Sequence, residues 1–161
     1  MDAEAYNRCV DEHADAVFRF ALKHLRDRDN AKDIVQDCFL RLWMKLDTVD
    51  QMKCRSYLFT MAHNLIVDRS RRRKFVTRYA DGHENILITH QPKACLKNEV
   101  DRLLEALSPL QRSLVLLRDL EGHSYQEIAA ITGMDLTKVK VYLYRARKAM
   151  QERIVDPALV A

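Results

Sequence analysis

Apolar residues recur every three or four positions over most of this 161-residue chain, and that spacing places them on one face of an α-helix. The first series is Tyr6, Val10, Ala14, Val17, Ala21 and Leu25, and the second is Ala31, Ile34, Val35, Cys38, Phe39, Leu42, Trp43 and Leu46. Three glycines and three prolines are too few for the many turns of a β-sandwich or barrel. The pattern therefore predicts an all-α protein.

A third helix is predicted to begin at Ser56, which can cap it, after a loop over residues 47–55. Its apolar positions are Tyr57, Leu58, Met61, Ala62, Leu65 and Ile66, and it ends in the basic tract of residues 69–74. Residues 75–95 lose the helical period and contain Gly82 and Pro92, so they are predicted to be a linker. The chain then divides into a helical domain over 1–74, the linker, and a second helical domain over 96–161.

The second domain begins with helical spacing at Leu96, Val100, Leu103, Leu104 and Leu107. Ser108-Pro109 then predicts a capped helix start, and that helix runs through residues 114–120 to Gly122. A short helix over 125–132, a turn at residues 133–135 and a longer helix from Leu136 predict a helix-turn-helix. Ser124 and Glu127 fit a capping box, and Gly133 can adopt the positive φ of the turn.

The charge of the chain is unevenly distributed. Residues 1–50 carry a net charge of −3, whereas residues 51–161 carry +7, and a basic C-terminal part favours a polyanionic partner. The last helix of the helix-turn-helix is rich in cations and tyrosines, which suits the major groove of DNA. A plain helical hairpin with a solvated basic face is the alternative. The basic tract at 69–74 taken alone is equally consistent with a solvated tail.

The four cysteines lie far apart and contain no CxxC pair. We expect Cys9, Cys38, Cys54 and Cys95 to be reduced packing residues of a cytoplasmic protein. A zinc site of Cys95 with His83 and His90 would lack a second cysteine pair, so no metal site is predicted. The chain shows no phosphate loop, nucleophile elbow or HExxH motif, no signal peptide and no apolar run of transmembrane length. No catalytic residue, cofactor or small-molecule substrate is therefore expected, and His63 and His123 are expected to pack or cap.

Five stretches resemble the extracytoplasmic-function (ECF) sigma factors of the sigma-70 family, which are bacterial transcription initiation factors. Residues 31–43 (AKDIVQDCFLRLW) are similar to region 2.2 of that family, and residues 56–68 (SYLFTMAHNLIVD) to regions 2.3 and 2.4. Residues 107–112 (LSPLQR), 121–129 (EGHSYQEIA) and 139–147 (VKVYLYRAR) are similar to region 4. The resemblance implies binding to core RNA polymerase and to the −10 and −35 elements of promoter DNA, with DNA melting at initiation.

The resemblance also implies roles for particular residues. On the second helix, the positions similar to those that bind the β′ clamp of the polymerase are Gln36, Asp37, Leu40 and Arg41. On the third helix, the positions similar to those that bind the melted −10 element are Asn64, Asp68, Arg69, Arg71, Arg72 and Arg73. On the last helix, the positions similar to those that read the −35 duplex are Lys138, Lys140, Val141, Tyr142, Tyr144 and Arg145. The apolar residues of 114–120 would meet the β flap.

Two places depart from the family pattern. Many members carry Gly-Thr before the valine of the last helix and Ser-Arg after the following basic residue, whereas this chain carries Thr137-Lys138 and Val141-Tyr142 there. The resemblance therefore does not imply a particular −35 sequence. It does not imply an anti-sigma factor either, although such a protein is a further candidate partner. The alternative functions are a stand-alone helix-turn-helix transcriptional regulator and a helical adaptor that does not bind DNA.

Overall fold

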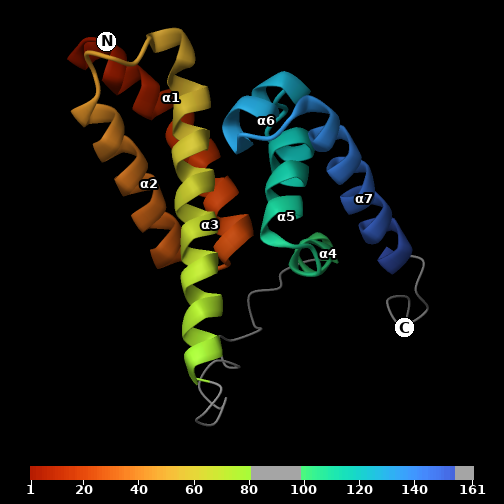
Figure 1. The fold of residues 1–161 in the computed structure, drawn as a ribbon. Coiled ribbons are helices and arrows are strands. Elements are labelled where there is room, and N and C mark those ends of the chain that lie inside the picture. The colour runs from red at the N-terminus through yellow and green to blue at the C-terminus, as the bar shows by residue number, and fades with distance from the viewer. Residues whose placement is uncertain (81–98, 155–161) are drawn as a thin grey trace.

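The computed structural model describes residues 1–80 and 99–154, with residues 74–80 described as backbone only. Every regular element in these two ranges is helical, as the apolar spacing predicts (Figure 1). None of the described helices combines the length and the apolarity needed to span a lipid bilayer.

The N-terminal unit consists of α1 (Ala3–Leu25), α2 (Arg28–Met44) and α3 (Cys54–Ala80), with a short 3-10 turn, η1 (Gln51–Lys53), before α3. Carboxylates satisfy the free amides at two helix starts. The Asp2 side chain accepts a hydrogen bond from the Ala5 amide, and the Asp27 side chain caps the first turn of α2. The cap at Asp27 marks the boundary between α1 and α2.

The C-terminal unit consists of α4 (Glu99–Glu105), α5 (Pro109–Val115), one π-helical turn, η4 (Leu116–Leu120), then α6 (Tyr125–Thr132) and α7 (Leu136–Ile154). Ser108 and Ser124 each form a capping box, the first with Gln111 and the second with Glu127. Gly133 adopts φ 70° between α6 and α7, a conformation that glycine reaches without a Cβ clash. The predicted helix-turn-helix is thus present.

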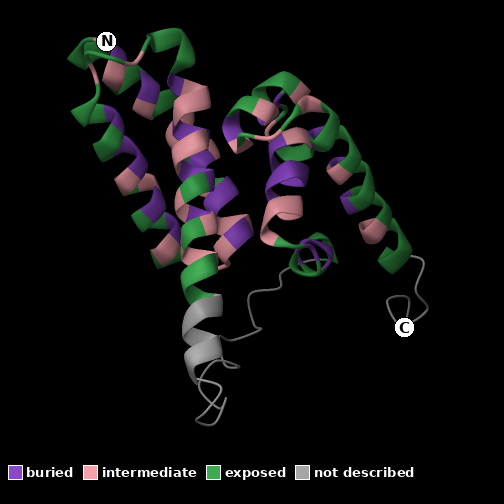
Figure 2. Cartoon of the chain, viewed as in Figure 1, coloured by how far each residue is buried: buried purple, intermediate pink, exposed green. Residues whose placement is uncertain are grey.

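The two units pack against each other and share one hydrophobic core. In Figure 1, α3 lies beside α5 and α6, and the buried segments in Figure 2 face this junction from both sides. Phe20 and Phe59 of the N-terminal unit and Leu114 and Ile128 of the C-terminal unit are fully buried in that core. The prediction of two helical units is correct, and the shared core fixes their relative position in this structure.

Ion pairs surround the junction, and in each pair the cation comes from the N-terminal unit. Arg19 binds the Glu121 carboxylate through two hydrogen bonds of 3.2 Å, and Lys23 Nζ lies 2.8 Å from Asp101 Oδ1. Arg26 Nη1 lies 2.9 Å from Glu105 Oε2. The facing surfaces are therefore complementary in charge as well as apolar.

Three boundaries differ from the sequence prediction. Helix α3 begins at Cys54 rather than after Ser56, because the preceding turn η1 leads directly into it and is capped by Asp50. The same helix continues to Ala80, beyond the predicted domain end at residue 74. The helix predicted from Pro109 to Gly122 changes to a π-helical turn at Leu116. The remainder of the predicted linker, residues 81–95, lies outside the described residues.

The cysteine prediction is also wrong in part. Cys9 of α1 and Cys54 of α3 form a disulfide with Cα atoms 6.8 Å apart, because the packing of these helices brings together residues 45 positions apart. Cys38 is free and buried, as predicted. The zinc site considered in the sequence analysis lies outside the described residues, since it would consist of Cys95, His83 and His90.

Candidate nucleic-acid and protein interfaces

Helix α7 separates a buried apolar face from an exposed basic face. Val139, Leu143 and Ala146 are buried against the rest of the unit. Most of the predicted DNA-binding side chains of this helix are exposed, namely Lys138, Lys140, Val141, Tyr144 and Arg145, and Tyr142 is half-buried. The 3.6-residue period keeps the two faces apart. The exposed face can contact a long polyanionic groove without disturbing the core.

Two cations near this face differ in how firmly they are held. Arg147 binds the Asp119 carboxylate through hydrogen bonds of 2.6 and 3.2 Å, and this interaction raises the pKa of Arg147. Lys140 instead has its ammonium 5.8 Å from the centre of the Tyr125 ring, a weaker cation–π contact. Arg147 therefore stabilises the unit, whereas Lys140 can reach a ligand.

Helix α3 presents a second polar and basic face. Asn64, Asp68, Arg71 and Arg72 are exposed and follow the spacing of one helical side, and Arg73 is exposed next to them. The predicted residue Arg69 is only half-exposed, and its guanidinium donates to Asn30 Oδ1 at 3.2 Å. Arg69 therefore links α3 to α2 by a hydrogen bond and also contributes positive charge.

Helix α2 exposes a mixed apolar and polar surface on the outer side of the N-terminal unit. Three of the four predicted polymerase-binding residues are exposed, namely Gln36, Leu40 and Arg41, and Asp37 is half-buried. Sequence reasoning placed Trp43 in the core stripe, but it is 49% exposed and meets the Tyr6 ring edge-on. The neighbouring Met44 is also exposed, so this surface is more apolar than the sequence analysis predicted.

The predicted apolar surface over residues 114–120 is largely core. Leu114, Leu116 and Leu117 are buried, and only Leu120 is substantially exposed, because the preceding leucines belong to the shared hydrophobic core. An apolar hollow of about 320 Å³ lies instead between α4, η4 and α7. Its lining includes Val100, Leu104, Val115, Leu120, Met150 and Ile154. The spacing of Val100 suggested core packing, so the sequence did not reveal this surface.

Three buried histidines lie at the junction of the units. His24 Nε2 and His63 Nδ1 lie 2.7 and 2.8 Å from the Ser113 hydroxyl oxygen, and His123 Nδ1 lies 3.3 Å from Glu127 Oε2. Burial lowers the pKa of both His63 and His123 to about 4 and also lowers that of His24. These neutral rings contribute to packing, which agrees with the expectation for His63 and His123.

Comparison with family models assigns both units to one family. Residues 9–76 match the model of Sigma-70 region 2, and residues 97–150 match the model of Sigma-70, region 4. The first match covers most of α1, all of α2 and most of α3, and the second covers α4 to most of α7. The same two regions carried the resemblance in the sequence, in the same order.

Two proteins of known function are similar to this chain over most of its length, and both are sigma factors. The ECF RNA polymerase sigma factor SigE of Mycolicibacterium smegmatis is 27% identical over 92% of this chain, which spans 61% of that protein's length. The ECF RNA polymerase sigma factor SigW of Bacillus subtilis is 25% identical over 96% of this chain and 91% of its own length.

A solved structure has a similar arrangement over almost the whole chain. It is the sigma factor RpoE from Bartonella quintana in complex with the anti-sigma factor NepR, with a TM-score of 0.75 and 28% identity. The match covers 94% of this chain and 98% of that one.

Proposed function

Because this chain belongs to the ECF group of the sigma-70 family, we propose that it binds core RNA polymerase and directs it to promoters through their −35 and −10 elements. In this role it is an initiation factor without catalytic activity, cofactor or small-molecule substrate, and it acts in the cytoplasm. The observation that carries the proposal is the presence of both matched regions in one chain, each with an exposed basic helix.

Helix α7 is proposed to read the −35 element as duplex DNA. Its N-terminal half would enter the major groove, where cations reach phosphates and base edges. The residues proposed for this contact are Lys138, Lys140, Val141, Tyr142, Tyr144 and Arg145, of which only Tyr142 is half-buried. Arg147 is not proposed to contact DNA, because its ion pair with Asp119 joins α7 to η4.

Helix α3 is proposed to bind the −10 element in its melted form. Asn64 and Asp68 would meet unstacked bases, and Arg69, Arg71, Arg72 and Arg73 would meet phosphates. An exposed asparagine amide can donate to one base edge and accept from another. Binding a flipped base couples recognition to strand opening, because the binding free energy offsets the cost of unstacking.

Two surfaces are proposed to hold the polymerase. The outer face of α2, with Gln36, Asp37, Leu40 and Arg41, would bind the β′ clamp, and its exposed apolar character supports this. The hollow between α4, η4 and α7 would receive the β flap in place of the buried leucines of 114–120. An anti-sigma factor is a further proposed partner, because the similar RpoE structure contains one.

A stand-alone helix-turn-helix regulator is the alternative. That function would use α6 and α7 but would leave the region 2 match and the exposed face of α2 without a role.

The test is whether the purified chain co-elutes with core RNA polymerase in size-exclusion chromatography at moderate salt. Co-elution is expected for the wild type and for Met52→Asp, which changes an exposed methionine outside the α2 face. Leu40→Asp should lose it, because a charge replaces an exposed leucine of the proposed clamp surface. A wild-type chain that elutes alone would favour the regulator.

A further inference from the structure

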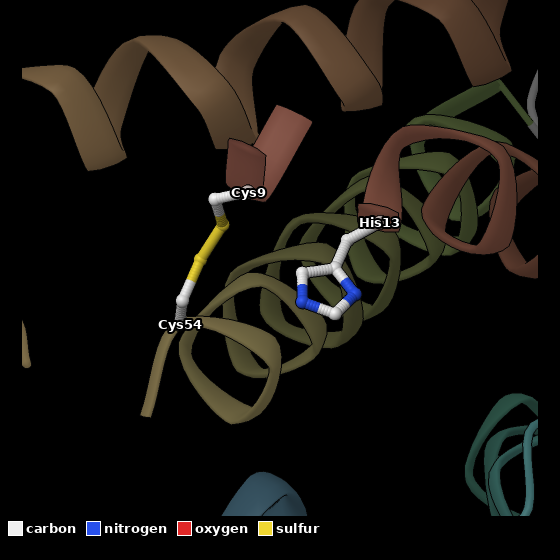
Figure 3. Close-up of side chains that lie close together, drawn as sticks. All are labelled: Cys9, His13 and Cys54. Carbon is white, nitrogen blue, oxygen red and sulfur yellow. A yellow bond between two sulfur atoms is a disulfide. The ribbon is translucent and has the colours of Figure 1, made fainter. Parts of the chain in front are cut away.

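Two cysteines and a histidine meet between α1 and the start of α3, on a part of the molecule that the proposed function does not use. Cys9 and His13 are one helical turn apart on α1, and Cys54 is the first residue of α3 (Figure 3). The ligand atoms of the three side chains all lie within 4.8 Å of one another. This is the one such group of three among the described residues.

The donor set is chemically selective. Two thiolates and an imidazole are ligands that zinc binds tetrahedrally, and a zinc ion with three protein ligands keeps its fourth position for water. The sulfur atoms are buried, with Cys9 3% and Cys54 2% exposed, whereas the His13 side chain is 19% exposed. Solvent can therefore reach the cluster from the histidine side while the sulfur side is dry.

We propose that Cys9, His13 and Cys54, with the two thiols reduced, form a binding site for one zinc ion that joins α1 to α3. The disulfide present in this structure is the competing state of the same two sulfur atoms. Zinc and the disulfide exclude each other, because each cysteine sulfur either bonds to the other sulfur or coordinates the metal.

Conversion between the two states requires a reductant. A dithiol donates two electrons and two protons to the Cys9–Cys54 disulfide, which becomes two thiols while the dithiol becomes a disulfide. Zinc then displaces a proton from each thiol and binds the resulting thiolates. A cytoplasmic protein is exposed to reducing thiols, so the reduced form is the expected one where a sigma factor acts.

A neighbouring carboxylate can help to orient the histidine ligand. Glu12 Oε2 lies 3.7 Å from His13 Nε2, and metal-binding histidines commonly direct their second ring nitrogen toward a carboxylate.

The test uses the dithiol-reduced full-length chain, freed of reductant without oxygen and titrated with Co²⁺ and then Zn²⁺. The expected results are one equivalent of bound metal, a thiolate-to-cobalt charge-transfer band, the visible absorption of tetrahedral cobalt, and displacement by zinc. His13→Gln should weaken binding at least about tenfold, the loss that removal of even an outer-shell partner causes. None of these results depends on DNA or polymerase binding.

Variants locate the site. Cys9→Ser and Cys54→Ser should each abolish the charge-transfer band, and circular dichroism checks that each variant is folded. Cys38→Ala and Cys95→Ser are the matched controls, because they remove the other two cysteines and should leave the band unchanged. A reduced wild-type chain that takes up no metal would overturn the proposal. A band that survives Cys9→Ser or disappears in Cys95→Ser would overturn it as well.

Discussion

Ser113 has one hydroxyl proton and two histidine neighbours, so one of the facing ring nitrogens accepts a hydrogen bond and the other donates one. The hydroxyl donates to one ring and accepts from the other, with oxygen-to-nitrogen distances of 2.7 and 2.8 Å to His24 and His63. A protonated ring would be a second cation in a dry site beside Arg112, whose charge contributes to the lowered pKa of His24. Burial at the contact between the units therefore favours the neutral form of both histidines.

Acidification should weaken the folded, packed state. The pKa of His63 falls from 6.5 to about 4 on folding, so the unfolded chain binds more protons between these values. The free energy of unfolding should decrease as pH falls from 6.5 to about 4, by on the order of 1–3 kcal/mol for His63. Thermal melting at several pH values measures this decrease. The melting temperature of His63→Gln should depend less on pH than that of the wild type. A melting temperature that is constant over that range would contradict the prediction.

Lys140 is the α7 residue expected to contribute most to sequence preference. It is exposed near the N-terminal end of the helix, where a recognition helix inserts most deeply. Lys140→Ala should relax preference within the −35 element at a cost of roughly 1–3 kcal/mol if the side chain contacts a guanine. Holoenzyme binding to a library of −35 point mutants measures the change.

The control for Lys140 is Lys148→Ala, which removes the same charge about 12 Å further along the helix at ~1.5 Å per residue. This control should weaken binding to all sequences slightly or not at all. A −35 preference profile that stays the same in Lys140→Ala would exclude Lys140 from base recognition.

At the scale of the elements, those with their own stop and start signals were predicted well. The bounds of α6 follow from Ser124 and Gly133, which act through a capping hydrogen bond and a positive φ within the same segment. The end of α3 has no such signal: residues 69–74 are compatible with a helix, which simply continues to Ala80.

Features that depend on packing between distant segments could not be predicted from the sequence. The family resemblance assigned the leucines of 114–120 to a partner surface, but all except Leu120 are buried in the core that the two units share. Trp43 has the spacing of a core residue and is half-exposed. Cys9 and Cys54 are brought together only by the packing of α1 on α3. Helical periodicity identifies an apolar face without identifying what covers it.

Helix α3 should act in strand opening more than in the first binding of duplex DNA. Asn64→Ala removes an exposed amide without creating a cavity, so the melting temperature of the protein should not change. Permanganate reactivity of unpaired thymines should decrease while closed-complex formation by the holoenzyme is retained. Gln126→Ala removes an exposed amide from α6 and is the control that should leave opening unchanged. Normal opening by Asn64→Ala, or a loss of protein stability, would contradict the assigned role.

At the scale of the whole molecule, the junction holds the two proposed DNA-binding units in one compact body. The two promoter elements are separate sites, and we expect the holoenzyme to hold α3 and α7 in a different relative position from that of the packed chain. The ion pairs at the junction are partly exposed, and each contributes on the order of 1 kcal/mol or less. Separation of the units would also expose the apolar core that they share, so the polymerase surfaces that replace this contact would have to cover it.

Charge reversal at Glu121 should separate the two units in the free protein, because this side chain is buried and an unpaired lysine there costs more free energy than the loss of one exposed ion pair. Glu121→Lys places a cation beside both Arg19 and Arg55, whose guanidinium donates to the Glu121 carbonyl oxygen. Small-angle X-ray scattering should then show a radius of gyration above the value of roughly 15 Å typical of a compact chain of this length. Adding Arg19→Glu should reverse part of the increase, and Glu4→Lys, within α1, should have no effect. An unchanged radius in Glu121→Lys would show that the ion pairs do not hold the units together.

The most direct test of the central claim is promoter opening that requires both the chain and core RNA polymerase. Promoter fragments are first recovered by transcribing the source organism's genomic DNA with core enzyme plus the chain and sequencing the RNA 5′ ends. Each fragment is then probed with permanganate in the presence of core enzyme, the chain, or both. Reactive thymines within the −10 element are expected only with both, and the chain alone should bind these fragments weakly. Tight, specific duplex binding by the chain alone, with no opening when core enzyme is added, would contradict the account.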